Sequence, residues 1–520
     1  MHAHIVGSGL AGLSAAVYLV RDGGMSGSDI TIYEAGSSLG GAMGIAGGPS
    51  SGYVLPAGRI FEAEYRCTLD LLSHIPAASD PGISVKDEIL DFNARHGFRD
   101  TAHIIDRDGN VVRSSHYGLS VRDRLDLVLL ALTPEAMLEG SRIEAHFGEA
   151  FFRTEFWLLW TTIMGCLPQH GALEMRRYLN RFLHLLPTLS DMTMMYRTRY
   201  NQYDAIAEPL TRWLRERDVR FLIGAWVRAI GFATSAAEFS ATSLAYERDG
   251  TATQVTIAPK DIVLVTNGSQ VADLSVGSMT EPPRARSDGR SWALWESLAA
   301  GRSGFGNPAA FFGARHVPDT QWLSFTVTTV ETRFFALMTK LTGEEPGRGG
   351  LLTLRDSNWL ITLTIFHQPE LIGQPAGTLV WWGYALYPDR PGNSVPKPAS
   401  ACTGAEILQE TLHHLGFGHE TDAIMAGSTC VPCLLPYAGS VWLPRGHADR
   451  PRVVPTGSTN IGFIGQFAEM PLETAFTMEY SVRSARMAVA TLLGLDVELP
   501  SVYQGQFDPH ALYGALKALA

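Results

Sequence analysis

Cysteine is scarce in this chain, with five residues among 520. So few cysteines exclude a disulfide framework of the kind that holds small secreted domains together. The closest pair, Cys430 and Cys433, forms a C-x-x-C, which leaves a redox or metal site as an alternative. Because no second pair accompanies it, we predict that both thiols pack in the core and that the chain holds no metal.

Long apolar runs and basic clusters are also missing. No stretch reaches the roughly 18 consecutive apolar residues that a membrane span needs. Lys and Arg number 41 against 52 Asp and Glu, a net charge of −11, and no five basic residues run together, so we expect no nucleic-acid partner. Residues 3–20 look like a strand and helix interrupted by glycine rather than a signal peptide, which favours a cytoplasmic protein.

What the sequence does contain, at its start, is a dinucleotide fingerprint. The apolar segment His4–Val6 leads into a G-x-G-x-x-G at Gly7, Gly9 and Gly12, and the helix-like run 14–20 follows. Glycines permit the tight turn and let the backbone approach a pyrophosphate, while the helix N-terminus offers N–H groups to the anion. In this context the motif predicts a flavin-type dinucleotide site rather than an ordinary glycine-rich turn.

An acidic residue stands where such a site needs one. A second predicted strand, residues 29–33, ends at Glu34, which lies 25 residues after Gly9. A carboxylate at the end of the second strand is placed to accept a hydrogen bond from a ribose hydroxyl. The sequence therefore predicts that Glu34 contacts the ribose of the dinucleotide.

The nucleotide-binding sequence is interrupted by insertions. Strand patterns return at 219–222 and 261–266, and residues 461–466 precede an amphipathic helix expected to start near Glu473. We predict an α/β fold containing a Rossmann-like FAD-binding domain built from discontinuous segments. These segments are residues 1–66, 218–284 and 451–494.

Two insertions and a tail make up the rest. Residues 67–217 show helical periodicity and predict a largely helical insertion that lines the substrate site. Residues 285–450 alternate apolar and polar side chains, as in 322–328, and predict the β-rich part of a mixed α+β substrate domain. Residues 495–520 form a tail whose end helix docks on its own domain or, alternatively, contacts a membrane.

Several long segments resemble the oleate hydratases, also called myosin-cross-reactive antigens, which are FAD-dependent fatty acid hydratases. The most specific are E-M-R-R-Y at Glu174–Tyr178 and Y-N-Q-Y at Tyr200–Tyr203. Gly58-Arg59 and the segments 430–437 and 457–467 also match, and the likeness covers nearly the whole chain in order.

The resemblance implies that water adds across the cis-9 double bond of oleate-like acids to give 10-hydroxy acids, with FAD required but no net electron transfer. It implies Tyr178 as the proton donor and Gln202 as an amide near the double bond. We expect the neighbouring Arg176, Arg177 and Arg181 to favour the phenolate and so to make the phenol a stronger acid. The alternatives are a core tyrosine with a satisfied hydroxyl and a turn-forming polar cluster.

The chain departs from the family pattern after Gly58-Arg59. Most of the family has a water-activating glutamate next, whereas this chain has Ile60, as in a subgroup that lacks this carboxylate. Either neutral groups position the water, or Glu62 or Glu64 reaches in from a rearranged loop. We favour neutral groups, because both glutamates are expected on a solvated helix face.

The family positions that hold the fatty acid head group are also altered. They fall in 436–445, where Arg445 is a candidate carboxylate anchor and Ser440 a candidate helper. An arginine can bind a carboxylate through two parallel N–H donors. A surface role for Arg445 is the alternative.

The resemblance also implies which residues contact the cofactor, because they occupy the positions of the family's motifs. The pyrophosphate, ribose, adenine and isoalloxazine contacts implied in this way are Gly7, Gly9, Leu10, Ala11, Gly12, Glu34, Gly40, Gly41, Gly58, Arg59, Val227, Gly465 and Gln466.

Three functions compete on the sequence alone. The first is a fatty acid hydratase of the hydro-lyase class with an unsaturated fatty acid substrate. The second is an FAD-dependent oxidoreductase, a desaturase or oxidase acting on a lipid or amine, and the third is a flavoprotein that binds fatty acids without turnover. Many relatives carry an N-terminal extension that helps dimer contacts, whereas here the first predicted strand begins almost at Met1, so we favour a monomer over a homodimer. Peripheral contact with a membrane is an alternative to a purely cytoplasmic location.

Overall fold

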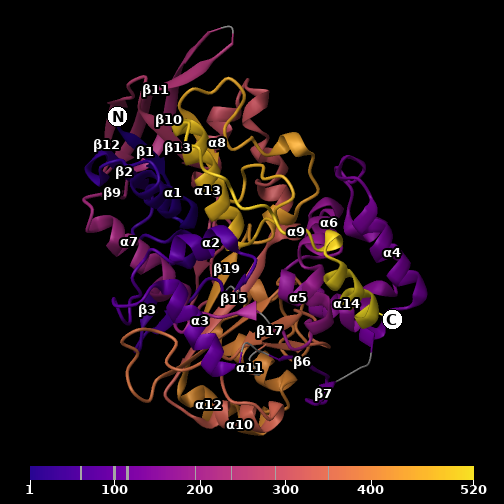
Figure 1. Ribbon diagram of the computed structural model, residues 1–520. Helices are drawn as coiled ribbons and strands as arrows, with labels where there is room; N and C mark the ends of the chain where they lie inside the picture. Colours follow the sequence, from indigo (N-terminus) through magenta and orange to yellow (C-terminus); the bar gives the residue numbers. More distant parts are fainter. Residues whose placement is uncertain are drawn as a thin grey trace.

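The computed structural model describes residues 1–58, 61–97, 101–112, 116–193, 195–235, 237–286, 288–348 and 351–519 (Figure 1). Within these residues the nucleotide-binding unit centres on a five-stranded sheet in the order β20-β13-β1-β2-β9. All of its neighbouring strands pair in parallel. The strands are β1 (Ala3–Val6), β2 (Ile30–Glu34), β9 (Arg220–Ile223), β13 (Ile262–Thr266) and β20 (Ile461–Ile464).

This sheet joins segments that are hundreds of residues apart in the sequence. Parallel strands buried on both faces read as continuous apolar runs, and β13 and β20 are apolar in this way. The predicted α/β fold with a Rossmann-like unit made of discontinuous segments is confirmed. The exact domain boundaries stay a prediction.

Two helices pack together against this sheet. Helix α1 (Leu10–Arg21) follows β1 directly and contacts α13 (Met478–Leu493). The second helix was expected to start near Glu473 but begins at Met478. The reason is local, because the Thr477 hydroxyl accepts a hydrogen bond from the Tyr480 amide at 3.2 Å and caps the helix there.

A larger mixed sheet forms the second layer. Within the described residues its strand order is β14-β19-β15-β18-β17-β16-β6-β7. The strands are β6 (Ala102–Ile105), β7 (Val111–Val112), β14 (Ser275–Val276), β15 (Trp322–Thr329), β16 (Leu351–Leu354), β17 (Ile361–Thr364), β18 (Leu379–Ala385) and β19 (Ser428–Leu435). Strand β6 pairs in parallel with β16, so the insertion 67–217, expected to be largely helical, also supplies strands to this sheet.

In the part of the chain that the structure describes, three smaller sheets hold the remaining strands. A three-stranded antiparallel sheet contains β10 (Trp226–Thr234), β11 (Phe239–Arg248) and β12 (Thr251–Thr256). Two-stranded pairs join β3 (Ala46–Gly48) to β4 (Gly52–Val54) and β5 (Phe61–Glu62) to β8 (Met195–Tyr196).

The remaining helices surround these sheets. Helix α11 packs on β19, α14 lies at the C-terminus, and α4 and α6 contact each other near it (Figure 1). These helices are α2 (Arg66–Leu72), α3 (Val85–His96), α4 (Val121–Leu132), α5 (Glu155–Met164), α6 (Ala172–Arg181), α7 (Glu208–Arg215), α8 (Arg290–Ala299), α9 (Val317–Thr320), α10 (Arg333–Thr342), α11 (Gly404–His414), α12 (Thr421–Ala426) and α14 (Pro509–Leu519). Among the helices described, none combines the length and apolarity needed to cross a bilayer.

The C-x-x-C pair lies in β19. Cys430 and Cys433 are buried free thiols. Burial raises the pKa of Cys433 to about 12, so the thiolate that redox chemistry needs is disfavoured. The prediction that this pair packs in the core is confirmed.

Candidate functional site

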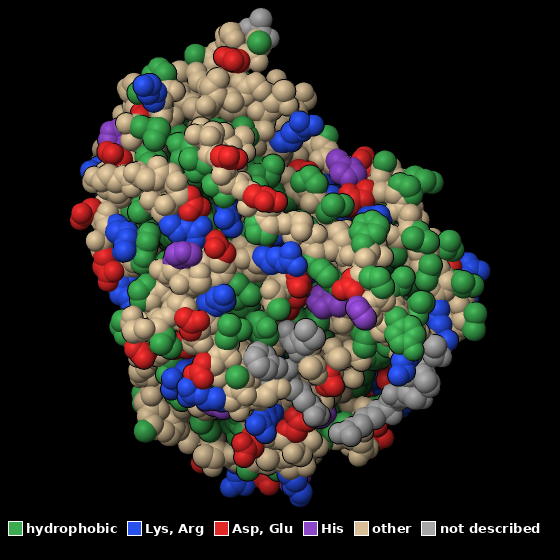
Figure 2. All heavy atoms as spheres, viewed as in Figure 1, with side chains coloured by type: hydrophobic (Ala, Val, Ile, Leu, Met, Phe, Trp, Pro, Cys, Tyr) green, Lys and Arg blue, Asp and Glu red, His purple; other side chains and the backbone are tan. Residues whose placement is uncertain are grey.

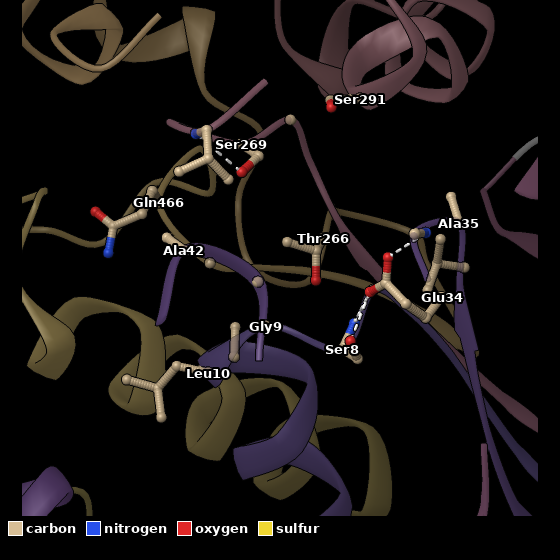
Figure 3. A pocket seen from close by; sticks show the side chains of 18 of the residues that line it. Ser8, Gly9, Leu10, Glu34, Ala35, Ala42, Thr266, Ser269, Ser291 and Gln466 are labelled. Carbon is tan, nitrogen blue, oxygen red and sulfur yellow. Dashed lines mark hydrogen bonds between the residues drawn. The ribbon is translucent and has the colours of Figure 1, made fainter. Parts of the chain in front are cut away.

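A cavity of about 430 Å³ opens at the carboxyl ends of the parallel strands (Figure 3). Val6, Glu34 and Thr266 line it from the ends of β1, β2 and β13, and Gly465 lines it just after β20. Open parallel sheets bind their ligands at this edge. The position alone therefore makes this the candidate nucleotide site.

The glycines of the fingerprint allow a ligand to approach closely. Gly7 has φ +97°, which a residue with a side chain rarely adopts. A Cβ on Gly41, which has φ +57°, would lie 2.9 Å from the Gly9 Cα. A Cβ on Gly12 would lie 2.0 Å from the Gly7 carbonyl oxygen, so Gly12 serves close packing of helix on strand rather than cavity lining.

The polar groups of this cavity suit a dinucleotide. Helix α1 begins after Gly9, and its N-terminus faces the cavity, since Gly9, Leu10 and Ala11 line it. No side chain of the described residues caps that end. The Thr266 hydroxyl is buried in the cavity wall and has no hydrogen-bond partner within the described residues. A ligand with phosphate and hydroxyl oxygens would satisfy both groups.

Glu34 is already bound to the fingerprint loop. One carboxylate oxygen accepts hydrogen bonds from the Ser8 amide at 3.0 Å and the Ser8 hydroxyl at 2.5 Å, and the other accepts one from the Gly36 amide at 2.7 Å (Figure 3). Glu34 lines the cavity, so the carboxylate fixes the loop from inside the site. Its contact with a ribose stays a prediction.

Ten of the thirteen residues expected to contact the cofactor line this cavity. They are Gly7, Gly9, Leu10, Ala11, Glu34, Gly40, Gly41, Val227, Gly465 and Gln466. Gly12 packs behind the loop, Gly58 lines two other cavities, and Arg59 lies outside the described residues. Sequence reasoning missed Trp226 and Arg290 in the wall, since no local motif marks them.

A second, largely apolar cavity adjoins the first. Gln270 and Val271 line both cavities. Around the second one lie aromatic and aliphatic side chains of the large sheet and nearby loops, including Trp322, Trp382, Tyr384, Leu435 and Phe476. An acyl chain would fit such a lining, because little polar surface has to lose water there.

A third cavity holds Gln202. It shares Ala57, Gly58, Arg197 and Phe366 with the second cavity. Gln202 is buried at the start of a π-helical turn, Tyr203–Ala207, which leads into α7. The structure therefore places this predicted amide on the cavity system.

Tyr178 lies behind the wall of the second cavity. Its hydroxyl donates a hydrogen bond to the Ala475 carbonyl, and its ring packs on Trp442 with centroids 4.4 Å apart. Phe476, the next residue after Ala475, lines the second cavity with φ +73°, a strained value for a bulky residue. Tyr178 itself is not among the described residues that line the three cavities, so the structure does not bring it together with Gln202.

The expectation that neighbouring arginines make Tyr178 more acidic is wrong for this conformation. Burial raises the pKa of Tyr178 well above its usual value, and Tyr65 and Glu174 add to the rise. Each arginine faces acidic partners instead: Arg176 and Arg177 bind Glu135, and Arg181 binds Glu62. Sequence proximity on a helix did not reveal these partners.

Arg445, the expected carboxylate anchor, also lies away from the three cavities. The Arg445 guanidinium is fully buried, with Nε 2.8 Å from Glu174 and Nη1 2.9 Å from Glu469. Ser440 is buried in a short turn, and neither residue is among the described residues that line the three cavities. Arg445 is therefore neither a surface arginine nor open to a substrate in this structure.

The two glutamates considered as substitutes for the missing carboxylate differ. Ile60 itself lies outside the described residues. Glu62, expected on a solvated helix face, is instead buried in β5, 2.9 Å from Arg181. Burial alone would raise the pKa of Glu62, but the His184 hydrogen bond and the Arg181 charge hold it below its usual value. Glu64 pairs with Arg66 near the surface.

Comparisons with known proteins agree over almost the whole chain. The sequence model described as the MCRA family matches residues 1–490. The chain is 34% identical to an oleate hydratase of Streptococcus pyogenes serotype M49 (strain NZ131) over 524 residues, covering 99% of this chain and 88% of that protein. It is 30% identical to a linoleate hydratase of Lactiplantibacillus plantarum over 557 residues, covering 99% and 98%.

Solved structures resemble the fold at low identity. A cyclohexylamine oxidase from Brevibacterium oxydans IH-35A superposes with a TM-score of 0.57 at 14% identity, covering 95% of this chain and 98% of that one. Wild-type putrescine oxidase bound to putrescine gives a TM-score of 0.53 at 12% identity, covering 95% and 99%. These likenesses show a Rossmann-type flavoprotein fold and nothing about the reaction.

Proposed function

This chain belongs to the MCRA family, and on that premise we propose that it is a fatty acid hydratase that adds water to an unsaturated acyl chain. The observation that carries the proposal is the contact between the two main cavities. A largely apolar cavity meets the candidate nucleotide cavity at Gln270 and Val271. An isolated double bond would thereby lie in a water-poor space beside the cofactor.

We propose FAD as the cofactor of the first cavity. The glycine loop and the N-terminus of α1 would hold the pyrophosphate, Glu34 the ribose and Gln466 the flavin end. Gln466 is well fixed for this role, since its amide nitrogen donates to the Thr477 carbonyl at 2.8 Å and the Ser481 hydroxyl at 2.9 Å. When bound, FAD would shape and polarise the site without net electron transfer.

The acid in our proposal is Tyr178. For an oleate-like acid, the phenolic proton would go to C9 and a water oxygen would bond to C10, giving a 10-hydroxy acid. The proton lost by that water would restore the phenol, so only water is consumed. Tyr178 would have to release the Ala475 carbonyl first, and since Phe476 follows in the cavity wall, movement of this strained segment would admit the phenol.

Water positioning in our proposal relies on neutral groups. Ile60 stands where most of the family has the water-activating glutamate, and Glu62 is bound in a buried ion pair with Arg181. If the alkene is protonated before water attacks, the other carbon becomes strongly electrophilic. The attacking water then has to be positioned more than deprotonated. We infer that the missing carboxylate weakens the hydratase without abolishing it.

We also propose that a monomer docks on a lipid surface. On α4 the exposed residues Val121, Leu125, Val128, Leu129 and Leu132 follow helical spacing and form one outward apolar face. On α14, which contacts the turn before α4, Leu512, Tyr513 and Leu516 are exposed as well. Figure 2 shows hydrophobic side chains gathered on this side of the molecule. A fatty acid substrate partitions into bilayers, which makes a membrane the partner that suits this surface.

The test of the function uses purified protein with added FAD and oleate under anaerobic conditions, without a nicotinamide cofactor. We expect 10-hydroxyoctadecanoate by gas chromatography with mass spectrometry and a flavin spectrum that stays oxidised. Bleaching of the flavin by oleate or by an amine would instead indicate an oxidoreductase. Oleate binding without product would indicate a binding protein.

A further inference from the structure

The largely apolar second cavity is lined by one cation, Arg197, among its described residues. Arg197 follows β8 directly and lines both the second and the third cavity. Among the described residues of the second cavity it is the one charged side chain. In the third cavity it is joined by His367 and Glu370.

Two histidines with basic neighbours also lie near this junction. The rings of His367 and His96 lie 4.7 Å apart. Burial lowers the pKa of His96, and the nearby Arg348 lowers it further. Burial, His96 and Arg199 lower the pKa of His367. Arg348 and Arg199 oppose the protonation of these rings, which places basic side chains near this end of the cavity system.

Glu370 lines the third cavity together with Arg197, and burial disfavours the charged form of its carboxyl. Burial raises its pKa well above the usual value against the attraction of Arg197, and Asp204 adds to the rise. Burial also lowers the pKa of Arg197, to about 10, which still leaves the guanidinium charged. A guanidinium that is the one charged side chain among the described residues of a largely apolar cavity, beside an acid whose charged form burial disfavours, favours an anionic ligand.

We propose that Arg197 anchors the carboxylate of the substrate at the junction of the second and third cavities, with the acyl chain in the second cavity. The proposal rests on the proposed function for the class of ligand, a long-chain fatty acid. A guanidinium presents two parallel N–H donors that match the two carboxylate oxygens. Arg197 therefore takes the role that the sequence suggested for Arg445, whose guanidinium is bound to Glu174 and Glu469.

Binding of a saturated ligand pair tests this assignment without turnover. The affinities of the FAD-loaded protein for octadecanoate and octadecanol are measured by isothermal titration calorimetry at pH 7. We expect Arg197→Met to weaken octadecanoate binding by about 10- to 100-fold and to leave octadecanol within about 2-fold, as for loss of a charged hydrogen bond. Arg197→Lys should recover part of the loss. Arg153→Met, at an arginine on the surface, is the matched control.

A second variant covers the case in which Arg197→Met does not fold. Glu370→Gln removes the acidic neighbour of Arg197, so octadecanoate should bind as well as before or more tightly. Normal octadecanoate affinity in folded Arg197→Met, or equal losses for acid and alcohol in Arg197→Lys, would overturn the proposal. Charge-selective binding by a protein that does not hydrate oleate would support the anchor and contradict the proposed function.

Discussion

Tyr178 donates its phenolic hydrogen bond to the backbone carbonyl of Ala475, directly before a residue of the apolar cavity wall. The neighbouring Phe476 amide donates to the Gln466 side chain at 2.5 Å, and Gln466 lines the nucleotide cavity. One short segment thus links the candidate acid, the apolar cavity and the cofactor end of the fold. We expect a ligand in the nucleotide cavity to affect the position of Tyr178 through this segment.

The Tyr178→Phe variant tests the acid. We expect turnover of oleate to fall by about 10²- to 10⁴-fold, the usual contribution of a general acid, with FAD content unchanged. Tyr18→Phe is the matched control, because Tyr18 is also buried and donates to a backbone carbonyl, that of Cys67. Full activity of Tyr178→Phe would show that another group supplies the proton.

The Gly41→Ala variant tests the cofactor loop. Its Cβ would lie 2.9 Å from the Gly9 Cα at a φ of +57°, so we expect a loss of about 1–3 kcal/mol in the free energy of unfolding. FAD content after purification should fall as well. Gly418→Ala, where a Cβ meets nothing within 4 Å, should leave both quantities unchanged. Normal FAD content in Gly41→Ala would place the dinucleotide elsewhere.

The Glu62→Gln variant separates a structural from a catalytic glutamate. Breaking the buried pair with Arg181 should lower the free energy of unfolding at pH 7 by about 3 kcal/mol, measured with urea. Since the folded-state pKa of Glu62 is lowered, this stabilisation is present above the unfolded pKa of about 4.3 and is lost as the pH falls through the folded pKa. The two proteins should therefore converge in stability only once the pH has fallen below that lowered folded-state pKa. Turnover of the folded fraction should persist, and a 100-fold loss would identify Glu62 as the water-activating base.

The double variant Leu129→Glu with Leu132→Glu tests the apolar face of α4. Both side chains are more than 60% exposed, at 62% and 71%, so the variant should fold normally. We expect co-sedimentation with phosphatidylglycerol vesicles to drop by about 10-fold, because two charges would enter the apolar boundary. Val330→Glu, at a residue 67% exposed on another surface, is the control. A wild-type dimer that the double variant dissociates would show that a second copy covers this face instead.

The local part of the site could be predicted from the sequence. Gly7, Gly9 and Glu34 belong to one unit of strand, turn, helix and second strand, so short-range rules placed them at one cavity. The two cysteines of β19 were likewise predicted to be core residues from the absence of a second pair.

The long-range part could not be predicted. Arg445 looked like an anchor because its partners, Glu174 and Glu469, are brought to it only by the tertiary fold. Tyr178 looked activated because three arginines are near it in sequence, whereas burial, with smaller contributions from Tyr65 and Glu174, raises its pKa. Arg197 carried no motif signal of its own and stands out only once two cavities meet at it.

The source of the new oxygen tests the central claim most directly. The FAD-loaded protein is incubated with oleate in ¹⁸O-labelled water under anaerobic conditions, and the product is examined by mass spectrometry. Our account predicts one ¹⁸O atom in the hydroxyl group at C10, with no reductant consumed. A hydroxyl group that carries oxygen from O₂, or a product that forms only with an added electron donor, would contradict it.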